Sequence, residues 1–253
     1  MRSFRIVSAT ALVLVLSACG GGTGEPRPTP PPRSPSPPSP SAAAYRPVID
    51  PKAFTDRITN PYFPLLPGTT RVYDGTKDSA PEHVEVTVTR TPRTVMGVRC
   101  VVIQDVVTSN GTLVEKTTDW YAQDRAGNVW YFGEDSKDYA NGVVTSTEGT
   151  WEAGVDGAQP GMVMPASPTV GQTYRQEYRP GVAEDAAKVL ELHATRRVPL
   201  GGFRDVRVTL DTDPLNPDKV ERKWYAPGIG LLAAVRQGSA HHESIELVRV
   251  VRQ

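Results

Sequence analysis

The stretch Asp119 to Glu134, DWYAQDRAGNVWYFGE, decides the fold that the sequence predicts. Its centre, Asp124 to Asn128, is typical of a short hairpin connection with a type I turn and a bulge, because glycine accepts a positive φ at little cost. Successive side chains of a strand point to opposite faces, so we expect Trp120 and Tyr121 on opposite faces of the incoming strand. Residues Trp130 to Phe132 should alternate on the outgoing strand. The stretch therefore predicts an antiparallel hairpin with aromatic side chains on both faces.

Alternation with a period of two continues on both sides of this hairpin, as in Val84, Val86 and Val88 with polar residues between them. Such alternation is typical of strands. We expect strands near 70–74, 83–91, 98–108, 112–123, 128–134, 142–148, 171–179, 185–197, 203–211, 219–226, 229–237 and 243–251. A short helix is predicted after Asp50-Pro51, which fit an N-cap and a first helical position. No stretch with helical period is long enough for a βαβ unit, so the strands should pair antiparallel.

The predicted fold is mainly β: one curved antiparallel sheet or half-barrel of about ten to twelve strands, with one short N-terminal helix and a long ordered loop. The loop is the segment from Glu148 to Val170, which is rich in glycine and proline. Loops longer than about 12 residues are commonly functional or disordered, and Trp151, Met162 and Met164 argue here for order. We expect it to lie over one mouth of the sheet. The charged segment Asp218 to Trp224, DKVERKW, should have one face open to water.

The N-terminus has the pattern of an export signal, with Arg2 and Arg5 before the apolar run from Ile6 to Leu16. Leu16-Ser17-Ala18-Cys19 resembles the lipobox of bacterial lipoproteins, which implies cleavage after residue 18 and an acyl chain such as palmitate on Cys19. The apolar run is shorter than the roughly 20 residues of a membrane-spanning helix. We therefore expect an extracytoplasmic protein that is anchored to the cell membrane by lipid.

Residues 1–18 are thus predicted to be the signal peptide, residues 19–44 the lipidated cysteine with a proline-rich disordered stalk, and residues 45–253 one β-rich extracytoplasmic domain. The chain has 28 basic and 28 acidic side chains, so losing Arg2 and Arg5 leaves 26 against 28. This balance gives nucleic acid no electrostatic support as a partner. The expected partners are the membrane, through the lipid on Cys19, and a hydrophobic small molecule or lipid.

Aromatic residues near the hairpin and the loop are the candidates for lining a ligand site in a curved sheet. Core packing is the other interpretation of each of them. The ligand-binding candidates are Trp120, Tyr121, Trp130, Glu134, Trp151, Glu152, Trp224 and Tyr225.

Carboxylates in the loops offer a second kind of chemistry. Asp156, Glu184 and Asp185 are weak candidates for a calcium site, because calcium prefers several carboxylate and carbonyl oxygens, but their spacing matches no known calcium loop. The four histidines lack the spacing of a zinc site, and we expect no cofactor. Glu134, Glu152 and Glu177 could serve a hydrolase, although pairing with arginines is the other reading. Cys100, in an apolar run, is expected to be a buried small hydrophobe.

Several segments together resemble an uncharacterised family of bacterial, mainly actinobacterial, envelope lipoproteins. They are Asn60 to Gly68, Asp119 to Glu134, Thr150 to Pro165, Tyr174 to Asp185 and Glu221 to Leu232. The family has no activity to carry over to this chain. YAPGIG, Tyr225 to Gly230, also resembles a feature of the half-barrel fold shared by periplasmic lipoprotein carriers and mycobacterial lipid-binding lipoproteins, which implies ligand binding on a curved sheet.

Three functions follow as expectations. The first is a lipid-anchored extracytoplasmic protein that binds a hydrophobic or envelope-derived ligand and catalyses no reaction. The second is a carboxylate-dependent hydrolase assisted by calcium, and the third is a structural or adhesive surface module, which predicts a filled core. The first is favoured, and no catalytic residue is assigned.

Overall fold

The computed structural model describes residues 45–237 and 242–252. The predicted signal peptide, the lipidation site Cys19 and the stalk therefore lie outside the described residues. The predicted extracytoplasmic domain begins at Tyr45, which is also the first residue that the structure describes.

Seventeen strands and one short 3-10 helix make up the secondary structure of the described residues. The bounds are η1 Pro51–Ala53, β1 Phe54–Thr55, β2 Thr69–Lys77, β3 Ala80–Val88, β4 Arg93–Val95, β5 Val98–Ser109, β6 Thr112–Asp124, β7 Val129–Ala140, β8 Val143–Ser146, β9 Trp151–Glu152, β10 Gln159–Met164, β11 Thr173–Arg175, β12 Glu177–Tyr178, β13 Ala186–Val198, β14 Gly201–Asp213, β15 Asn216–Ala226, β16 Gly230–Gln237 and β17 His242–Arg252. The predicted mainly β fold is confirmed, with more strands than the ten to twelve expected.

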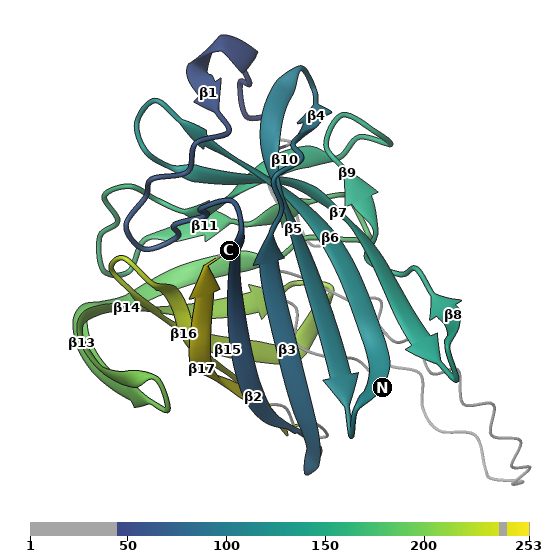
Figure 1. The fold of residues 1–253 in the computed structure, drawn as a ribbon. Coiled ribbons are helices and arrows are strands. Elements are labelled where there is room, and N and C mark those ends of the chain that lie inside the picture. Colours follow the sequence, from purple (N-terminus) through teal and green to yellow (C-terminus); the bar gives the residue numbers. More distant parts are fainter. Residues whose placement is uncertain (1–44, 238–241, 253) are drawn as a thin grey trace, which may run out of the picture.

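All strand pairs of this sheet are antiparallel, and the sheet curls into a nearly closed barrel. Strands β2, β3, β5, β6 and β7 follow one another as neighbours on one side, and β13 to β17 do so on the other. Figure 1 shows the first group in blue to teal and the second in green to yellow. One seam joins β17 to β2, and the other runs from β7 through β10, β12 and β11 to β13.

The aromatic hairpin forms β6 and β7 as the sequence predicts. Its connection is closed by Gly127, which has a φ of 88°, and by the Asp124 carboxylate, which accepts from the Asn128 backbone amide at 2.9 Å. Tyr121 pairs with Tyr131, and Asp119 pairs with Glu134, with a register shift between the two pairs. Because directly opposite residues of paired strands share a face, this bulge brings Tyr131 and Glu134 to the same face although they are three residues apart.

Two predicted elements differ from the structure. The N-terminal helix is only the three-residue turn Pro51–Ala53, because Phe54 and Thr55 then pair with β6 instead of continuing the helix. The segment from Glu148 to Val170 is ordered, but it contains strands β9 and β10. Since β10 hydrogen-bonds to both β7 and β12, this segment closes the barrel wall where a loop over the mouth was expected.

Gly161 in β10 shows how tightly this seam is packed. A Cβ atom at this position would lie 2.1 Å from the backbone oxygen of Gln176, which is far inside van der Waals contact. Only glycine therefore lets β10 approach the segment that precedes β12.

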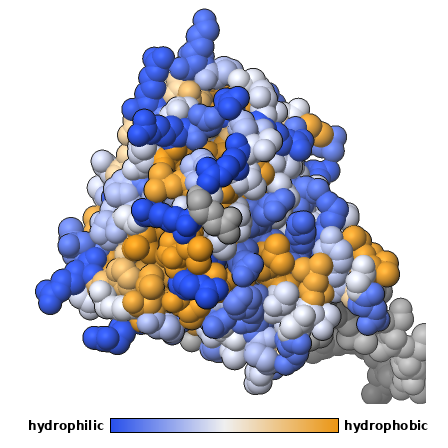
Figure 2. All heavy atoms as spheres, viewed as in Figure 1, coloured by the Kyte–Doolittle hydropathy of each residue, from blue (hydrophilic) through white to orange (hydrophobic). Residues whose placement is uncertain are grey.

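The outer surface carries exposed apolar side chains from separate parts of the fold. The large ones are Val48, Leu66, Met96, Val143, Val144, Val155, Val170 and Leu200. On the face shown in Figure 2, hydrophobic and charged side chains are interspersed. In the part of the chain that the structure describes, no helix is long and apolar enough to span a bilayer.

Candidate functional site

Two stacked tyrosines lie inside the barrel where its apolar and polar regions meet. The rings of Tyr121 and Tyr131 are 4.6 Å apart between centroids, with 15° between their planes. Phe63 packs on Tyr121 at 5.4 Å, and Trp151 meets Tyr131 edge-on at 5.3 Å. Both tyrosines are fully buried. Their rings thus belong to the apolar core, whereas their hydroxyl groups face charged side chains.

Four buried carboxylates are close enough to Tyr121 to raise its pKa. We call Asp105, Asp119, Glu134 and Glu177 the acidic cluster; each is at most 6% exposed. Tyr131 donates its hydroxyl hydrogen to Asp119 Oδ1 at 2.6 Å. Burial raises the pKa of Tyr121 well above its usual value, and the charges of the four carboxylates raise it further. The Tyr121 hydroxyl is therefore neutral and close to all four acids.

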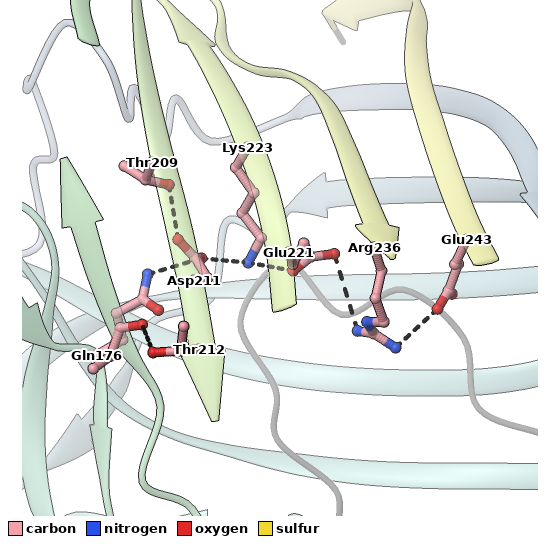
Figure 3. A network of polar contacts seen from close by, with 9 residues as sticks. Gln176, Thr209, Asp211, Thr212, Glu221, Lys223, Arg236 and Glu243 are labelled. Atoms are coloured by element: carbon pink, nitrogen blue, oxygen red, sulfur yellow. Dashed lines mark hydrogen bonds and ion pairs between the residues drawn. The ribbon is translucent and has the colours of Figure 1, made fainter. Parts of the chain in front are cut away.

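A row of alternating charges occupies the facing wall of the barrel. We call Asp211, Lys223, Glu221, Arg236, Glu243 and Lys77 the ion-pair row; it crosses β14, β15, β16, β17 and β2. Lys223 Nζ lies 2.9 Å from Asp211 Oδ2 and 2.9 Å from Glu221 Oε2. Arg236 Nη1 lies 2.8 Å from Glu243 Oε2, and Figure 3 shows these five side chains pointing toward one another across the strands. The acids of this row are thus matched by bases of the same row.

The register of the sheet explains why the row is continuous. Asp211 is opposite Glu221, Glu221 is opposite Arg236, Arg236 is opposite Glu243, and Glu243 is opposite Lys77. Opposite residues share a face, so all of these side chains point into the barrel.

The electrostatics of the row follow from burial and neighbouring charge. Burial alone would lower the pKa of Lys223, but Asp211 and Glu221 together raise it well above its usual value. Burial raises the pKa of Glu243 to about 8 although Arg236 and Lys77 act in the opposite direction. Burial likewise raises the pKa of Asp185 to about 7, against the opposing effect of Lys219. Part of the interior acid is therefore protonated at neutral pH.

The buried charges are strongly unequal in sign, unlike the chain as a whole. Among the described residues, eleven Asp and Glu side chains are buried, against three Lys and Arg, and Arg236 of the ion-pair row, whose side chain is 12% exposed, is a further interior base. The acids are Glu82, Asp105, Glu115, Asp119, Glu134, Glu177, Asp185, Asp211, Asp213, Glu221 and Glu243, and the bases are Arg71, Lys77 and Lys223.

The apolar half of the interior contains a small cavity. Phe63, Leu65, Tyr73, Val86, Ile103 and Leu231 surround a cavity of about 20 Å³. That is room for about one water, whereas small-molecule sites are typically some hundreds of Å³. This cavity therefore offers no space for a lipid chain.

Four of the predicted ligand-binding residues face the interior. Tyr121, Glu134 and Trp151 lie at the acidic cluster, since Glu134 pairs with Trp151 across β7 and β9. Tyr225 is buried on the opposite wall next to Lys223. The Tyr121 hydroxyl and the Trp151 Nε1 hydrogen make no hydrogen bond to any residue that the structure describes.

The other four predicted residues lie on the outer side of the barrel. Trp120 is buried beneath Arg93, whose guanidinium carbon is 4.1 Å from its ring centroid, and Glu152 forms an ion pair with the same arginine. Trp130 donates to the Asp124 carboxylate at 2.9 Å, and Trp224 lies beneath Arg196 at 4.4 Å. These residues pack the outer wall and do not line the interior.

The three metal candidates lie in separate surroundings. Asp156 forms an ion pair with Arg179, and Glu184 with Arg175, while Asp185 is buried beside Lys219. Within residues 45–237 and 242–252, no group of three His, Cys, Asp or Glu is arranged to hold a metal ion. Cys100 is a buried free thiol, as expected, and burial raises its pKa to about 12.

Asp105 and the ion-pair row are functional candidates that the sequence reasoning missed. DKVERKW exposes one face, as expected, since Asp218 and Arg222 are exposed, but the charged side chains of Glu221 and Lys223 on its other face are buried inside the barrel. The available signal was a charged residue at an inward position of an otherwise apolar strand, such as Asp105 between Ile103 and Val107. Because the sheet closes into a barrel, a charged residue at such a position lies in the interior and not on an exposed face.

No protein-family model matches the chain, and no curated protein matches it. Two solved structures are similar in fold. A candidate exported protein with a YmcC-like fold from Bacteroides fragilis has 13% sequence identity and a TM-score of 0.45, covering 76% of this chain and 99% of its own. A candidate lipoprotein from Parabacteroides distasonis has 13% identity and a TM-score of 0.41, covering 75% of this chain and 98% of its own. The resemblance to the actinobacterial family stays a prediction.

Proposed function

We propose that this protein is a lipid-anchored, extracytoplasmic binding protein that takes an envelope-derived ligand into the polar half of its barrel and catalyses no reaction. One observation carries the proposal: charged and hydroxyl-bearing side chains are buried inside a nearly closed sheet. Buried ion pairs rarely stabilise a fold more than well-packed apolar residues would. Their retention beside Tyr121 and Trp151 supports a binding role better than a purely structural one.

The proposed ligand differs from a simple lipid. The cavity among the apolar side chains measures about 20 Å³, so an acyl chain would find no room in it. The ligand should therefore place a polar group at the acidic cluster, and any apolar part must be short or lie outside the barrel.

The ligand test uses the full-length protein purified from the membranes of its own host. Native mass spectrometry should show a non-covalent adduct that is lost on denaturation. A variant with Glu134→Gln and Glu177→Gln should carry less of the adduct, whereas Glu191→Gln, at an exposed position of β13, should carry as much as the wild type. A protein that always has the mass of its own covalent chain would exclude the binding function.

The proposed anchor rests on the lipobox-like segment that ends at Cys19. A Cys19→Ser variant should move from the membrane fraction to the soluble extracytoplasmic fraction. Cys100→Ala is the matched control and should stay in the membrane fraction, because Cys100 is buried in the barrel domain. Membrane association of the Cys19→Ser variant at the wild-type level would contradict the anchor.

A further inference from the structure

The hairpin of β13 and β14 ends in an exposed apolar turn. We call Val198 to Phe203, VPLGGF, the hairpin tip; its Pro199 and Gly202 are exposed, and Leu200 is 39% exposed. Three register shifts between the two strands bend the hairpin, which curls at the left edge of the molecule in Figure 1. The Leu200 backbone amide donates to the Leu247 oxygen of β17 at 3.1 Å and holds the tip against the barrel wall. The Leu200 side chain is thus presented to the surroundings from a fixed backbone.

Arginines flank the hairpin tip on both sides. The segment Leu192 to Arg204 contains three arginines and no aspartate or glutamate. One of them, Arg196, is used within the fold, because it pairs with Glu246 at 2.7 Å. The other two, Arg197 and Arg204, are exposed and form no ion pair with any residue that the structure describes. The tip therefore combines an exposed leucine with two guanidinium groups that are open to an external anion.

The exposed apolar turn between β7 and β8 differs from the hairpin tip in the sign of its charge. Val143 is 65% exposed and Val144 is 43% exposed, so this turn is more apolar at its surface than the tip. The segment Asp138 to Thr150 around it contains two acids and no lysine or arginine. Only the first of these two apolar turns thus has positive charge beside it, and the second serves as its internal control.

An apolar side chain between arginines is complementary to the surface of an anionic phospholipid membrane. Apolar residues enter the boundary between headgroups and acyl chains, while arginine and lysine are attracted to anionic headgroups. Guanidinium groups also bind phosphate through paired hydrogen bonds. A second copy of this chain fits the tip less well, because two identical tips would bring Arg197 and Arg204 against themselves.

The chain that precedes the described domain is long enough for the tip to reach a membrane. Twenty-five residues separate Cys19 from Tyr45, and a polyproline II chain of that length would span about 80 Å. A domain of this size has a radius of gyration of about 17 Å. The tether therefore does not choose the face that meets the lipid, and it keeps the domain at a high local concentration at which a weak contact is sufficient.

We infer that the hairpin tip, with Arg197 and Arg204, docks the folded domain onto the surface of an anionic phospholipid membrane. Leu200 enters the headgroup region, and the two guanidinium groups bind lipid phosphates beside it. This contact orients the barrel on the membrane and is separate from ligand binding in its interior. It uses the proposed lipid anchor as a tether only.

The test places an environment-sensitive fluorophore on the tip of the full-length protein in lipid vesicles. Gly202→Cys supplies the thiol, since a Cβ atom there meets only the end of the Arg197 side chain, at 3.8 Å. Cys100 is buried, and Cys19 carries lipid in the proposed anchor. On vesicles of phosphatidylglycerol and phosphatidylcholine the label should brighten and shift to the blue, and rising salt should reverse the change. On pure phosphatidylcholine the label should stay in water, as should a label at Val143→Cys on both kinds of vesicle.

Two variants of the labelled protein separate the apolar and the charged parts of the contact. Leu200→Asp should leave the label in water. Arg197→Gln with Arg204→Gln should lower the ratio of docked to undocked protein at least about tenfold, because each arginine is attracted to the anionic surface. The matched control, Arg57→Gln with Lys188→Gln, removes two positive charges at exposed positions elsewhere and should dock like the parent.

Flotation of the same vesicles distinguishes failure of the docking from failure of the anchor. Protein that floats with both kinds of vesicle while its tip label stays in water keeps the anchor and overturns the docking, which leaves an acidic protein as the partner for the tip. Equal docking of the Arg197→Gln, Arg204→Gln variant and its control also overturns it. Protein that floats only with the anionic vesicles and has its label in lipid supports the docking and overturns the anchor. Protein that floats with neither overturns both.

Discussion

The ammonium group of Lys223 lies 2.9 Å from the Asp211 carboxylate inside the barrel, where both side chains are less than 7% exposed. Lys223 also holds Glu221 at 2.9 Å, so one cation serves two buried acids. Replacing Lys223 with methionine leaves both acids without this partner. Breaking a buried pair in this way typically costs about 3–5 kcal/mol.

We therefore expect Lys223→Met to lower the free energy of unfolding by about 3–5 kcal/mol, as measured by urea denaturation followed by circular dichroism. Lys188→Met, at an exposed position of β13, is the control and should change stability by no more than about 0.5 kcal/mol. If the two variants had the same free energy of unfolding, the ion pairs of Lys223 would not stabilise the fold.

The stability of the protein should rise as the pH falls from about 8 to about 5. Burial raises the pKa of Asp185 from 3.8 to about 7 and that of Glu243 from 4.5 to about 8. The folded state thus binds these two protons more tightly than the unfolded chain does. The stability that they contribute is fully present below pH 4 and is lost as the pH rises through about 7 and 8.

Thermal unfolding at several pH values checks this dependence. Asp185→Asn should flatten the slope and raise the melting temperature at pH 8, because the asparagine needs no proton to be neutral. Burial lowers the pKa of Lys77, so this lysine gives the stability a pH dependence of the opposite sign. The wild type and Asp185→Asn both contain Lys77, so the difference between them reports the Asp185 carboxyl group alone. Asp218→Asn, at an exposed position, should leave the slope unchanged; a wild-type slope of the opposite sign would contradict the assignment.

The sequence predicts the sheet well because strand alternation and turn residues are local signals. The pairing of Tyr121 with Tyr131 follows from the turn at Asp124 to Asn128 and needs no distant contact. The predicted helix after Asp50 is wrong beyond its first turn because Phe54 and Thr55 gain strand partners almost seventy residues away. Such long-range pairing has no local signal.

The placement of the candidate residues was predicted only in part for the same reason. Tyr121, Glu134, Trp151 and Tyr225 were named as candidates for their aromatic or acidic character, and all four face the interior. Trp120 and Trp224 are aromatic as well, but they lie under arginines on the outer side of the barrel wall. Which face of a strand points inward depends on barrel closure, which the strand pattern alone does not define.

Arg71 joins the lead-in segment before β2 to the turn before β16. Its guanidinium is buried and donates to the backbone oxygens of Ile229 at 2.8 Å and Pro64 at 2.5 Å. Arg71→Leu would leave both carbonyl oxygens without these donors. Since a hydrogen bond to a charged group contributes about 1.5–3 kcal/mol, we expect a loss of about 2–5 kcal/mol in chemical denaturation.

Arg197→Leu is the matched control for Arg71, because Arg197 is exposed on β13. Its effect on the unfolding free energy should stay within about 0.5 kcal/mol. A similar effect of both substitutions would mean that the two backbone bonds of Arg71 do not stabilise the fold.

Gly161 tests whether the seam through β10 closes the barrel as described. The Cβ atom of an alanine would lie 2.1 Å from the backbone oxygen of Gln176, so the strand that carries it must move away from β12. Gly161→Ala should therefore destabilise the protein by at least about 2 kcal/mol and raise hydrogen exchange in β10 and β12. Gly202→Ala meets only the end of the Arg197 side chain, at 3.8 Å, and should be tolerated. Unchanged hydrogen exchange in Gly161→Ala would place the closure of the barrel elsewhere.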